Sequence, residues 1–372
     1  MAHNLEFKNG QYSFVETAKG AGAWHGLGQR IEVEGDSGID IKRALEMSQA
    51  NYEVALQPVV ALTPELVAAM ENDTMINAGD LLRHCMKGVK ATMRMDNKES
   101  IGCVSDTYGI VQNSRMFEVL GMLASGKDMN REDVPIVETA GVLGNGERCF
   151  VSMKFPEPIR IGGSQNDIID MYLIGENSHD GSGTFKIIVS PCRVVCQNTL
   201  QLAIASKKSS ISFRHSRFVN DRIDMLNKET AEMAYKTLGM YDEYKQYFEA
   251  ELERLRQIKV NDKWAEKILA KALLPDEAVD IYFKNGCNIN SDDITTRSKN
   301  ILTNAMDALM SGVGQDNDEL KGTGLHVING ITTYFQNTMN WKDNEKKFIS
   351  ITEGTCYDKL QKVYKGVLEL AA

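Results

Sequence analysis

The sequence predicts an α+β fold, in which a β-rich body with inserted helices is followed by a helical C-terminal region. Before about residue 215, short runs rich in β-branched and aromatic residues alternate with turns that contain Gly and Asn. After that point, apolar residues recur at intervals of three and four, as they do on one face of a helix. A composition of 42% hydrophobic and 25% charged residues is typical of a globular protein. We therefore expect a mixed body over 1–215 and a mostly helical region over 216–372, and the pattern leaves open whether the two pack as one unit.

Within the first region the pattern predicts strands and helices in alternation. The pair Asn145-Gly146 is typical of a tight hairpin, because a type I′ turn needs residues that accept a positive φ. The expected strands cover residues 52–62, 90–95, 101–112, 167–174 and 184–189. The expected helices cover residues 39–49, 64–71, 79–88 and 114–125.

The helical region opens with a long amphipathic segment over about 220–260. Its apolar positions from Tyr241 to Ile258 form one face, and Gly239 is a candidate break or kink. This face has enough apolar surface to pack on the body or on a neighbouring subunit, so a homo-oligomer through this helix is one expectation. Further helices are expected at about 262–273, 276–284, 292–311, 323–340 and 354–370.

The bulk properties restrict the environment and the partners. A formal charge of -9 and a pI near 5.4 give no overall attraction to phosphate backbones, so nucleic-acid binding would need a local basic surface. No apolar run reaches the roughly 20 residues of a membrane helix, and the N-terminus is too polar for a secretory signal. Seven scattered cysteines indicate free thiols in a reducing compartment. We expect a cytoplasmic protein without membrane contact.

Two polar segments are candidate ligand sites. The loop from Glu176 to Gly183 crowds Asn177, Ser178, His179 and Asp180 beside two glycines, so these side chains could bind or act on a ligand. Its competing interpretation is a wide hairpin turn, since Asp-Gly and Ser-Gly are ordinary turn formers. His25, between Trp24 and Gly26, is a second candidate, although a buried Trp that pins the N-terminal segment explains that pattern better.

The spacing of Cys192 and Cys196 suggests a metal site only in a helix. There the two β-carbons would lie roughly 6 Å apart, whereas in a strand they would lie about 13 Å apart, too far for one ion. No second cysteine pair is present. We expect no metal and no cofactor.

The most concentrated positive segment lies between Ser206 and Phe218. An alternating strand through Phe213 would turn Arg214 to the face opposite His215, and an aromatic ring beside cations is typical of single-strand nucleic-acid binders. The competing interpretation is an edge strand whose charges prevent aggregation. The cationic candidates are Arg193, Lys207, Lys208, Arg214 and Arg217.

Six short motifs together resemble the family catalogued as a domain of unknown function, DUF932. The resemblance covers most of the chain, and its centre is the most specific part. It implies a phage or plasmid origin and a bacterial cytoplasm as workplace, and it implies no catalytic residues. The motifs lie at residues 23–28, 105–113, 177–182, 193–200, 214–216 and 322–324.

The expected function is non-enzymatic handling of single-stranded DNA in mobile-element DNA metabolism. The ligand site would combine Asn177, Ser178, His179 and Asp180 with the five cationic candidates. One alternative is an enzyme that acts on a nucleotide or phosphodiester through His179, Asp180 and His25. Another is an interaction protein that binds a host factor through its helical region.

Overall fold

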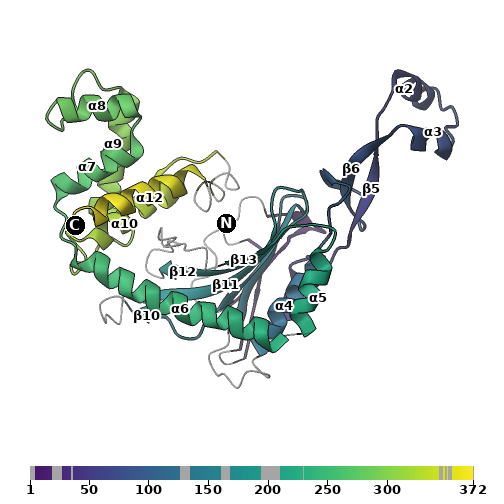
Figure 1. Cartoon of the computed structure of the whole chain (residues 1–372), viewed down its shortest axis with the longest axis horizontal. Coiled ribbons are helices and arrows are strands. Elements are labelled where there is room, and N and C mark those ends of the chain that lie inside the picture. The colour runs from purple at the N-terminus through teal and green to yellow at the C-terminus, as the bar shows by residue number, and fades with distance from the viewer. Residues whose placement is uncertain are drawn as a thin grey trace.

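The computed structural model describes residues 5–18, 27–34, 37–125, 135–160, 168–193, 210–228, 230–342, 347, 350 and 354–371, with the backbone alone at 123–125, 168, 190–193, 225–228, 230–241 and 244. It is an elongated α+β molecule, with a sheet at its centre, a group of helices at one end and a narrow arm at the other (Figure 1). None of the described helices is both long enough and apolar enough to cross a membrane.

The central sheet is antiparallel except for one parallel pair at its edge. Its strand order is β13-β12-β11-β9-β8-β3-β4, and β10 pairs with β11 beside this path. Only β3 and β4 run parallel. The strands are β3 (Phe14–Thr17), β4 (Gln29–Ile31), β8 (Ile136–Leu143), β9 (Arg148–Lys154), β10 (Ile159–Arg160), β11 (Ile168–Ser178), β12 (Phe185–Arg193) and β13 (Ser210–Phe213).

Two predicted hairpins form the middle of this sheet. The predicted hairpin at Asn145-Gly146 joins β8 to β9, but it is not a two-residue type I′ turn. Its last pair is Leu143↔Arg148, so the turn has four residues, and the positive φ angles lie at Gly144 (68°) and Gly146 (100°). The Glu176–Gly183 loop joins β11 to β12, whose ladder ends at the pair Glu176↔Lys186. A small β1–β2 hairpin (Phe7–Lys8 and Gln11–Tyr12) precedes the sheet.

Helices α1 (Ile41–Met47) and α4 (Asn113–Ser125) pack on the sheet. Asp40 caps α1 by accepting hydrogen bonds from the backbone N–H groups of residues 42 and 43. Leu120 of α4 approaches β11 at Gly175, where a Cβ would lie 2.3 Å from the Leu120 methyl carbon. The missing side chain at Gly175 therefore sets the close distance between helix and sheet.

The arm, defined here as residues 54–94, contains two strands of a three-stranded sheet. Strands β5 (Val54–Val60), β6 (Cys85–Arg94) and β7 (Ser100–Ser105) pair antiparallel in that order. The far end carries α2 (Pro64–Glu71) and α3 (Ala78–Arg83), which Figure 1 shows well away from the central sheet.

The helical region begins with α5 (Val219–Lys228) and the long α6 (Thr230–Gln257), which runs along the sheet toward the other helices (Figure 1). Helix α10 (Gly324–Thr333) is buried at every position and packs against α6, α9 and α12. The buried residues of the sheet and of these helices form one connected core. The remaining elements are α7 (Asp262–Leu273), α8 (Asp276–Lys284), α9 (Thr296–Ser311), the π-helical turn η3 (Tyr334–Thr338) and α12 (Thr355–Leu368).

Two local predictions were wrong, each for a physical reason. The helix expected over 79–88 ends at Arg83, because Cys85 already pairs with Val60 and begins β6. Gly239 does not end the long helix, since α6 continues through it. The apolar face of α6 is buried within its own chain at Phe248, Leu252 and Leu255, so the described part of this face is covered without a second subunit.

Candidate functional site

His179 lies in the connection between β11 and β12, and its side chain is completely buried. Its backbone is held from two directions. The N–H of His179 donates to the Glu147 carbonyl at 2.7 Å, and the Thr92 hydroxyl donates to the His179 carbonyl at 2.7 Å. The loop is therefore anchored both to the β8–β9 turn and to strand β6.

Asn113 and Asn177 hold the His179 ring in one orientation. The Nε2 atom of His179 lies 2.9 Å from Oδ1 of Asn113, and Nδ2 of Asn177 donates to the same oxygen at 3.1 Å. The amide nitrogen Nδ2 of Asn113 donates to the carbonyl of Ala50 at 3.2 Å. Because an amide oxygen only accepts, Nε2 of His179 carries the proton and Nδ1 presents a lone pair. We call these three side chains the His179 network.

A second histidine lies beside this network. His215 stacks on Tyr108 with ring centroids 4.7 Å apart, and its Nδ1 donates to the Gly109 carbonyl at 3.0 Å. The Tyr108 hydroxyl donates to the Ser178 carbonyl at 3.0 Å. The sequence motifs around residues 108, 113, 178 and 215 therefore meet in one place.

Both histidines are neutral near pH 7. Burial and, to a smaller extent, the nearby His215 lower the pKa of His179 to about 3, against the opposite effect of Asp180. Burial also lowers the pKa of His215. An effective general base has a pKa near the working pH, so His179 in this position is a poor proton acceptor and a rigid hydrogen-bonding group.

Asp180 belongs to a separate set of contacts on the loop. Its Oδ1 accepts from the backbone N–H of Ser182 at 2.9 Å and from the Ser182 hydroxyl at 2.7 Å. Arg148 donates to the Ser182 hydroxyl at 3.1 Å and to Glu176 at 3.2 Å. His179 and Asp180 are thus neighbours in sequence whose side chains bond to different groups, one inside the protein and one on the loop.

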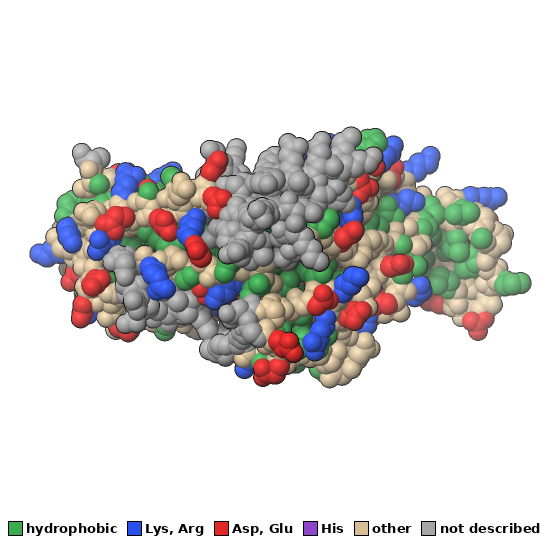
Figure 2. All heavy atoms as spheres, turned by 90° about the horizontal axis from the view of Figure 1, so that it is seen from below, with side chains coloured by type: hydrophobic (Ala, Val, Ile, Leu, Met, Phe, Trp, Pro, Cys, Tyr) green, Lys and Arg blue, Asp and Glu red, His purple; other side chains and the backbone are tan. Residues whose placement is uncertain are grey.

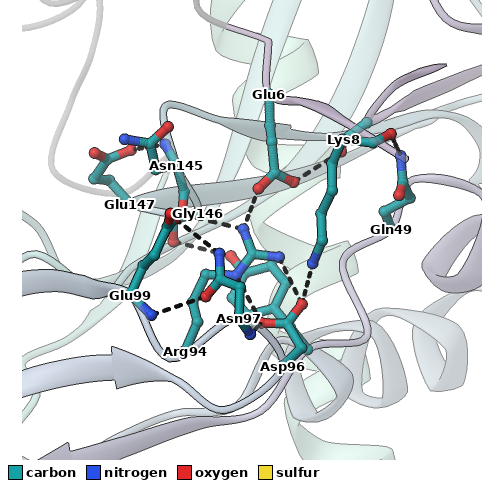
Figure 3. Close-up of polar contacts among 12 residues, drawn as sticks. Glu6, Lys8, Gln49, Arg94, Asp96, Asn97, Glu99, Asn145, Gly146 and Glu147 are labelled. Atoms are coloured by element: carbon teal, nitrogen blue, oxygen red, sulfur yellow. Dashed lines mark hydrogen bonds and ion pairs between the residues drawn. The ribbon is translucent and has the colours of Figure 1, made fainter. Parts of the chain in front are cut away.

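A buried arginine lies next to the His179 network. Arg94, at the end of β6, bonds to Glu6 and, at 3.0 and 3.1 Å, to the two oxygens of Asp96 (Figure 3). It also donates to the Asn145 carbonyl at 3.1 Å, and its guanidinium lies 3.8 Å from the centroid of the Tyr52 ring. The Tyr52 ring in turn meets His179 edge to face, at 6.1 Å. We call Arg94, Glu6, Asp96 and Tyr52 the Arg94 cluster.

Several polar atoms around the His179 network lack a hydrogen-bond partner within the part of the chain that the structure describes. Native proteins usually satisfy such atoms with ordered water or a bound polar group. No group of three or more His, Cys, Asp or Glu side chains suited to a metal occurs among the described residues. The atoms are Nε of Arg148, Oδ1 of Asn177, Oγ of Ser178, Nδ1 of His179, Nε2 of His215 and Oγ of Ser216.

The structure separates the predicted ligand residues into buried and exposed groups. Asn177, Ser178 and His179 are buried, whereas Arg214 and Arg217 are exposed. His215 is buried next to Arg214, so the predicted alternation after β13 is confirmed. The backbone of Arg193 ends β12, and its side chain lies outside the described residues, as do His25, Lys207, Lys208 and Cys196.

The exposed aromatic ring of the basic segment is not the expected one. Phe213 is half-buried and stacks on Phe185, with centroids 5.6 Å apart. Phe218 instead is 60% exposed, between Arg217 and the start of α5. Arg222 follows one helical turn later and is also exposed. No described carboxylate forms an ion pair with Arg214, Arg217 or Arg222.

Sequence reasoning missed Arg94, Tyr52 and Phe218. Arg94 stands inside an ordinary strand pattern, and nothing local indicates that it is buried. Phe218 had a usable signal, because it directly follows Arg217 at the predicted end of the strand region. Asn113 was part of a motif that carried the family resemblance, although its hydrogen bond to a residue 66 positions away could not be read from it.

Gly109 is the position where the two motif segments approach most closely. A Cβ there would lie 2.1 Å from the Ser216 carbonyl oxygen, which is too close for any alanine. We expect Gly109→Ala to lower the free energy of unfolding by about 1–3 kcal/mol, because the segment of His215 must move away. Chemical denaturation would measure this loss of stability. An unchanged midpoint for Gly109→Ala would contradict the close approach.

The fold and these networks define an α+β protein with an antiparallel sheet, a projecting arm and a neutral His–Asn core beneath a hairpin loop. The family model described as "Domain of unknown function (DUF932)" matches residues 100–353, more than half of the chain, and the chain belongs to this family. The matched range contains Asn113, His179 and His215, and the arm precedes it. No curated protein and no solved structure matches the chain.

Proposed function

We propose that this protein binds single-stranded DNA without catalysis, in the DNA metabolism of a phage or plasmid. The observation that carries the proposal is the segment from Arg214 to Arg222, here called the cationic segment. It presents the exposed ring of Phe218 among three exposed arginines.

The chemistry of the cationic segment suits a flexible, single-stranded backbone. Arginine forks bind phosphate oxygens, and a solvent-exposed ring offers a stacking surface to any base. Within the segment, Asp221 is the one carboxylate against three arginines, whereas the whole chain has a net charge of -9. A local positive region on an acidic protein confines phosphate binding to one place. Lys207, Lys208 and Arg193 lie before this segment in the sequence and would add to its positive charge.

The loop contributes differently from the original expectation. Asn177, Ser178 and His179 are buried, so in this proposal they do not contact the DNA. Instead they help to position the cationic segment through His215, which belongs to that segment, is buried and bonds to Gly109. In this proposal the His179 network is the support, and the arginines and Phe218 are the contact surface.

Fluorescence anisotropy with a labelled 20-nucleotide DNA tests the proposal. We expect binding at about 50 mM salt that weakens steeply by 200 mM, and a loss of at least about tenfold in affinity for the variant with Arg214, Arg217 and Arg222 all changed to Ala. We expect Phe218→Ala to weaken binding about 5- to 100-fold, with little change in the salt slope, because stacking is not ionic.

A variant with Arg43, Lys263 and Arg297 changed to Ala is the matched control, since it removes the same charge from exposed positions elsewhere. If this control loses as much affinity as the first variant, the binding is nonspecific and the assigned surface is wrong. An absence of binding at 50 mM salt would refute the function itself.

The alternative of an enzyme that uses His179 and Asp180 has one observation in its favour, the unpartnered Nδ1 of His179 within the described chain. The low pKa of His179 and its complete burial weigh against it. His179→Gln separates the two functions. A loss of phosphodiester turnover at an unchanged melting temperature would support the enzyme, whereas a lower melting temperature would assign His179 to structure.

A further inference from the structure

The far end of the arm exposes an unusual amount of apolar surface. We call residues 62–86 the arm tip. Six of the twelve large apolar side chains that are exposed in the described part of the chain lie there, and Figure 2 shows hydrophobic side chains gathered over this end of the molecule. They are Leu62, Val67, Met70, Met75, Leu82 and Met86, with exposed fractions from 37% to 97%.

Both helices of the arm tip nevertheless have N-cap residues that favour helix formation. Thr63 caps α2 by accepting from the N–H of Leu66, with Pro64 in the first turn, and Asn77 caps α3 by accepting from the N–H of Asp80. Helices of 8 and 6 residues are too short to be stable by themselves. Between them only Leu66 is buried. Helices that are capped but not packed need a partner surface.

The size of the patch fits an interface between two protein chains. The six side chains expose on the order of 600 Å² together, at the upper end of what a monomer leaves uncovered and near the roughly 800 Å² that each partner of a standard interface buries. Methionine, which supplies three of the six, adapts well to an opposing surface.

Charge favours a second copy of the same chain as that partner. Residues 62–90 hold four carboxylates and three cations, so two copies of this region can approach without the repulsion expected of a chain with a charge of -9. The carboxylates Glu65 and Glu71 lie on α2, whereas Lys87 and Lys90 lie on β6, and Arg83 at the end of α3 pairs with Asp80 of the same helix. A two-fold contact that places α2 of one copy against α3 and β6 of the other therefore pairs opposite charges.

The edge of the arm is unsuited to the competing mode, in which two sheets join strand to strand. The arm sheet has two edge strands, β5 and β7. Strand β7 pairs only with residues 89–93 of β6, and a Cβ at its Gly102 would lie 2.7 Å from Asp180, so the β11–β12 loop lies against this edge. Strand β5 contains Pro58, with an irregular register between Pro58 and Val60. A proline and a bulge both block continuous pairing at an edge. The contact must then use the side chains of the arm tip.

We propose that the arm tip is a dimerisation surface, on which two copies of this chain meet helix to helix around a two-fold axis. The arm holds this surface away from the central sheet (Figure 1), so neither body obstructs the approach of the other. The proposal is independent of the proposed DNA binding.

Size-exclusion chromatography with light scattering of the full chain, at roughly 1 to 100 μM, tests it. We expect a dimer that persists at high salt, because the contact is mainly apolar. We expect the double variant Met70→Glu and Leu82→Glu to raise the dimer dissociation constant by at least about 100-fold. Met75→Glu should act in the same direction, and it lies between α2 and α3, where no helix can be lost.

The control variant carries Met310→Glu and Val313→Glu, which place the same charges on two side chains of similar exposure, 52% and 53%, in the helical region. It should remain a dimer. A monomer throughout the concentration range would overturn the proposal, even if the arm tip then docks on a different protein. A dimer that survives all the arm-tip substitutions would overturn it as well.

Discussion

Replacing Arg94 by methionine is expected to lower the free energy of unfolding by about 3–5 kcal/mol. The guanidinium is fully buried and bonds to Glu6, Asp96 and the Asn145 carbonyl. Its removal leaves Glu6, which is 7% exposed, as a buried charge without its cation. It also removes the bonds from the end of β6 to Glu6 in the N-terminal segment and to Asn145 in the β8–β9 turn. Equilibrium unfolding in urea would measure the loss.

Two further variants identify the cause of this effect. Arg43→Met removes an exposed arginine and should change stability by less than about 0.5 kcal/mol. Adding Glu6→Gln to Arg94→Met should recover part of the loss, because the unpaired carboxylate is then gone. Arg94→Lys should remain destabilised, since one ammonium group cannot replace the planar fork that reaches both Glu6 and Asp96. Equal stability of Arg94→Met and the wild type would show that the cluster contributes nothing.

Acidification is expected to destabilise the protein below about pH 6.5, above the range in which most carboxylates titrate. An unfolded histidine takes up a proton below about pH 6.5, whereas burial lowers the pKa of folded His179 to about 3. Between these values the unfolded chain binds more protons, so the contribution of His179 is complete above pH 6.5 and is lost as the pH falls toward 3. The slope is roughly 1.4 kcal/mol per pH unit from this residue, and His215 shifts in the same direction.

The pH dependence of the unfolding free energy between pH 7 and 4.5 tests this expectation. His179→Gln keeps a side-chain N–H for Asn113 but cannot be protonated, so its slope should be shallower than that of the wild type. The window excludes Asp96, because hydrogen bonds from Arg94 and Lys8 outweigh its partial burial and lower its pKa to about 2. A slope that is the same for wild type and His179→Gln would contradict the assignment.

The parts of the fold that could be predicted are those that depend on neighbouring residues. Helices α2 and α7 begin and end where the pattern places them, because caps and apolar spacing are local properties. The place of the β8–β9 hairpin follows from its turn residues, although the turn has four residues and its positive φ angles lie at Gly144 and Gly146. The strand order of the sheet does not, since β11 pairs with β9 and β3 with β8 through side chains and backbone groups far apart in sequence.

The candidate site shows the same division. The sequence pattern indicated His179 and Asp180 as unusual residues. Because they are adjacent, the prediction assigned both side chains to one ligand site. Whether a side chain points into the core depends on its distant contacts, here Asn113 and Thr92 for His179. The buried part of the predicted ligand loop, Ser178 and His179, instead bonds to surrounding segments through Tyr108 and Thr92. In the proposed function the contact surface is formed by the exposed arginines and Phe218, whereas the sequence pattern pointed to Phe213, which is half-buried on Phe185.

Strand β3 has a consequence for how the chain is made. All four of its residues are buried, and its antiparallel partner is β8, with Val15 opposite Ala140. During synthesis, β3 therefore leaves the ribosome about 125 residues before its partner, a delay of roughly 6–25 seconds at ordinary rates of translation. Over this interval the nascent chain carries Phe14 and Val15 of β3 without their antiparallel neighbour, and a chaperone that binds extended apolar segments would have an opportunity to bind there.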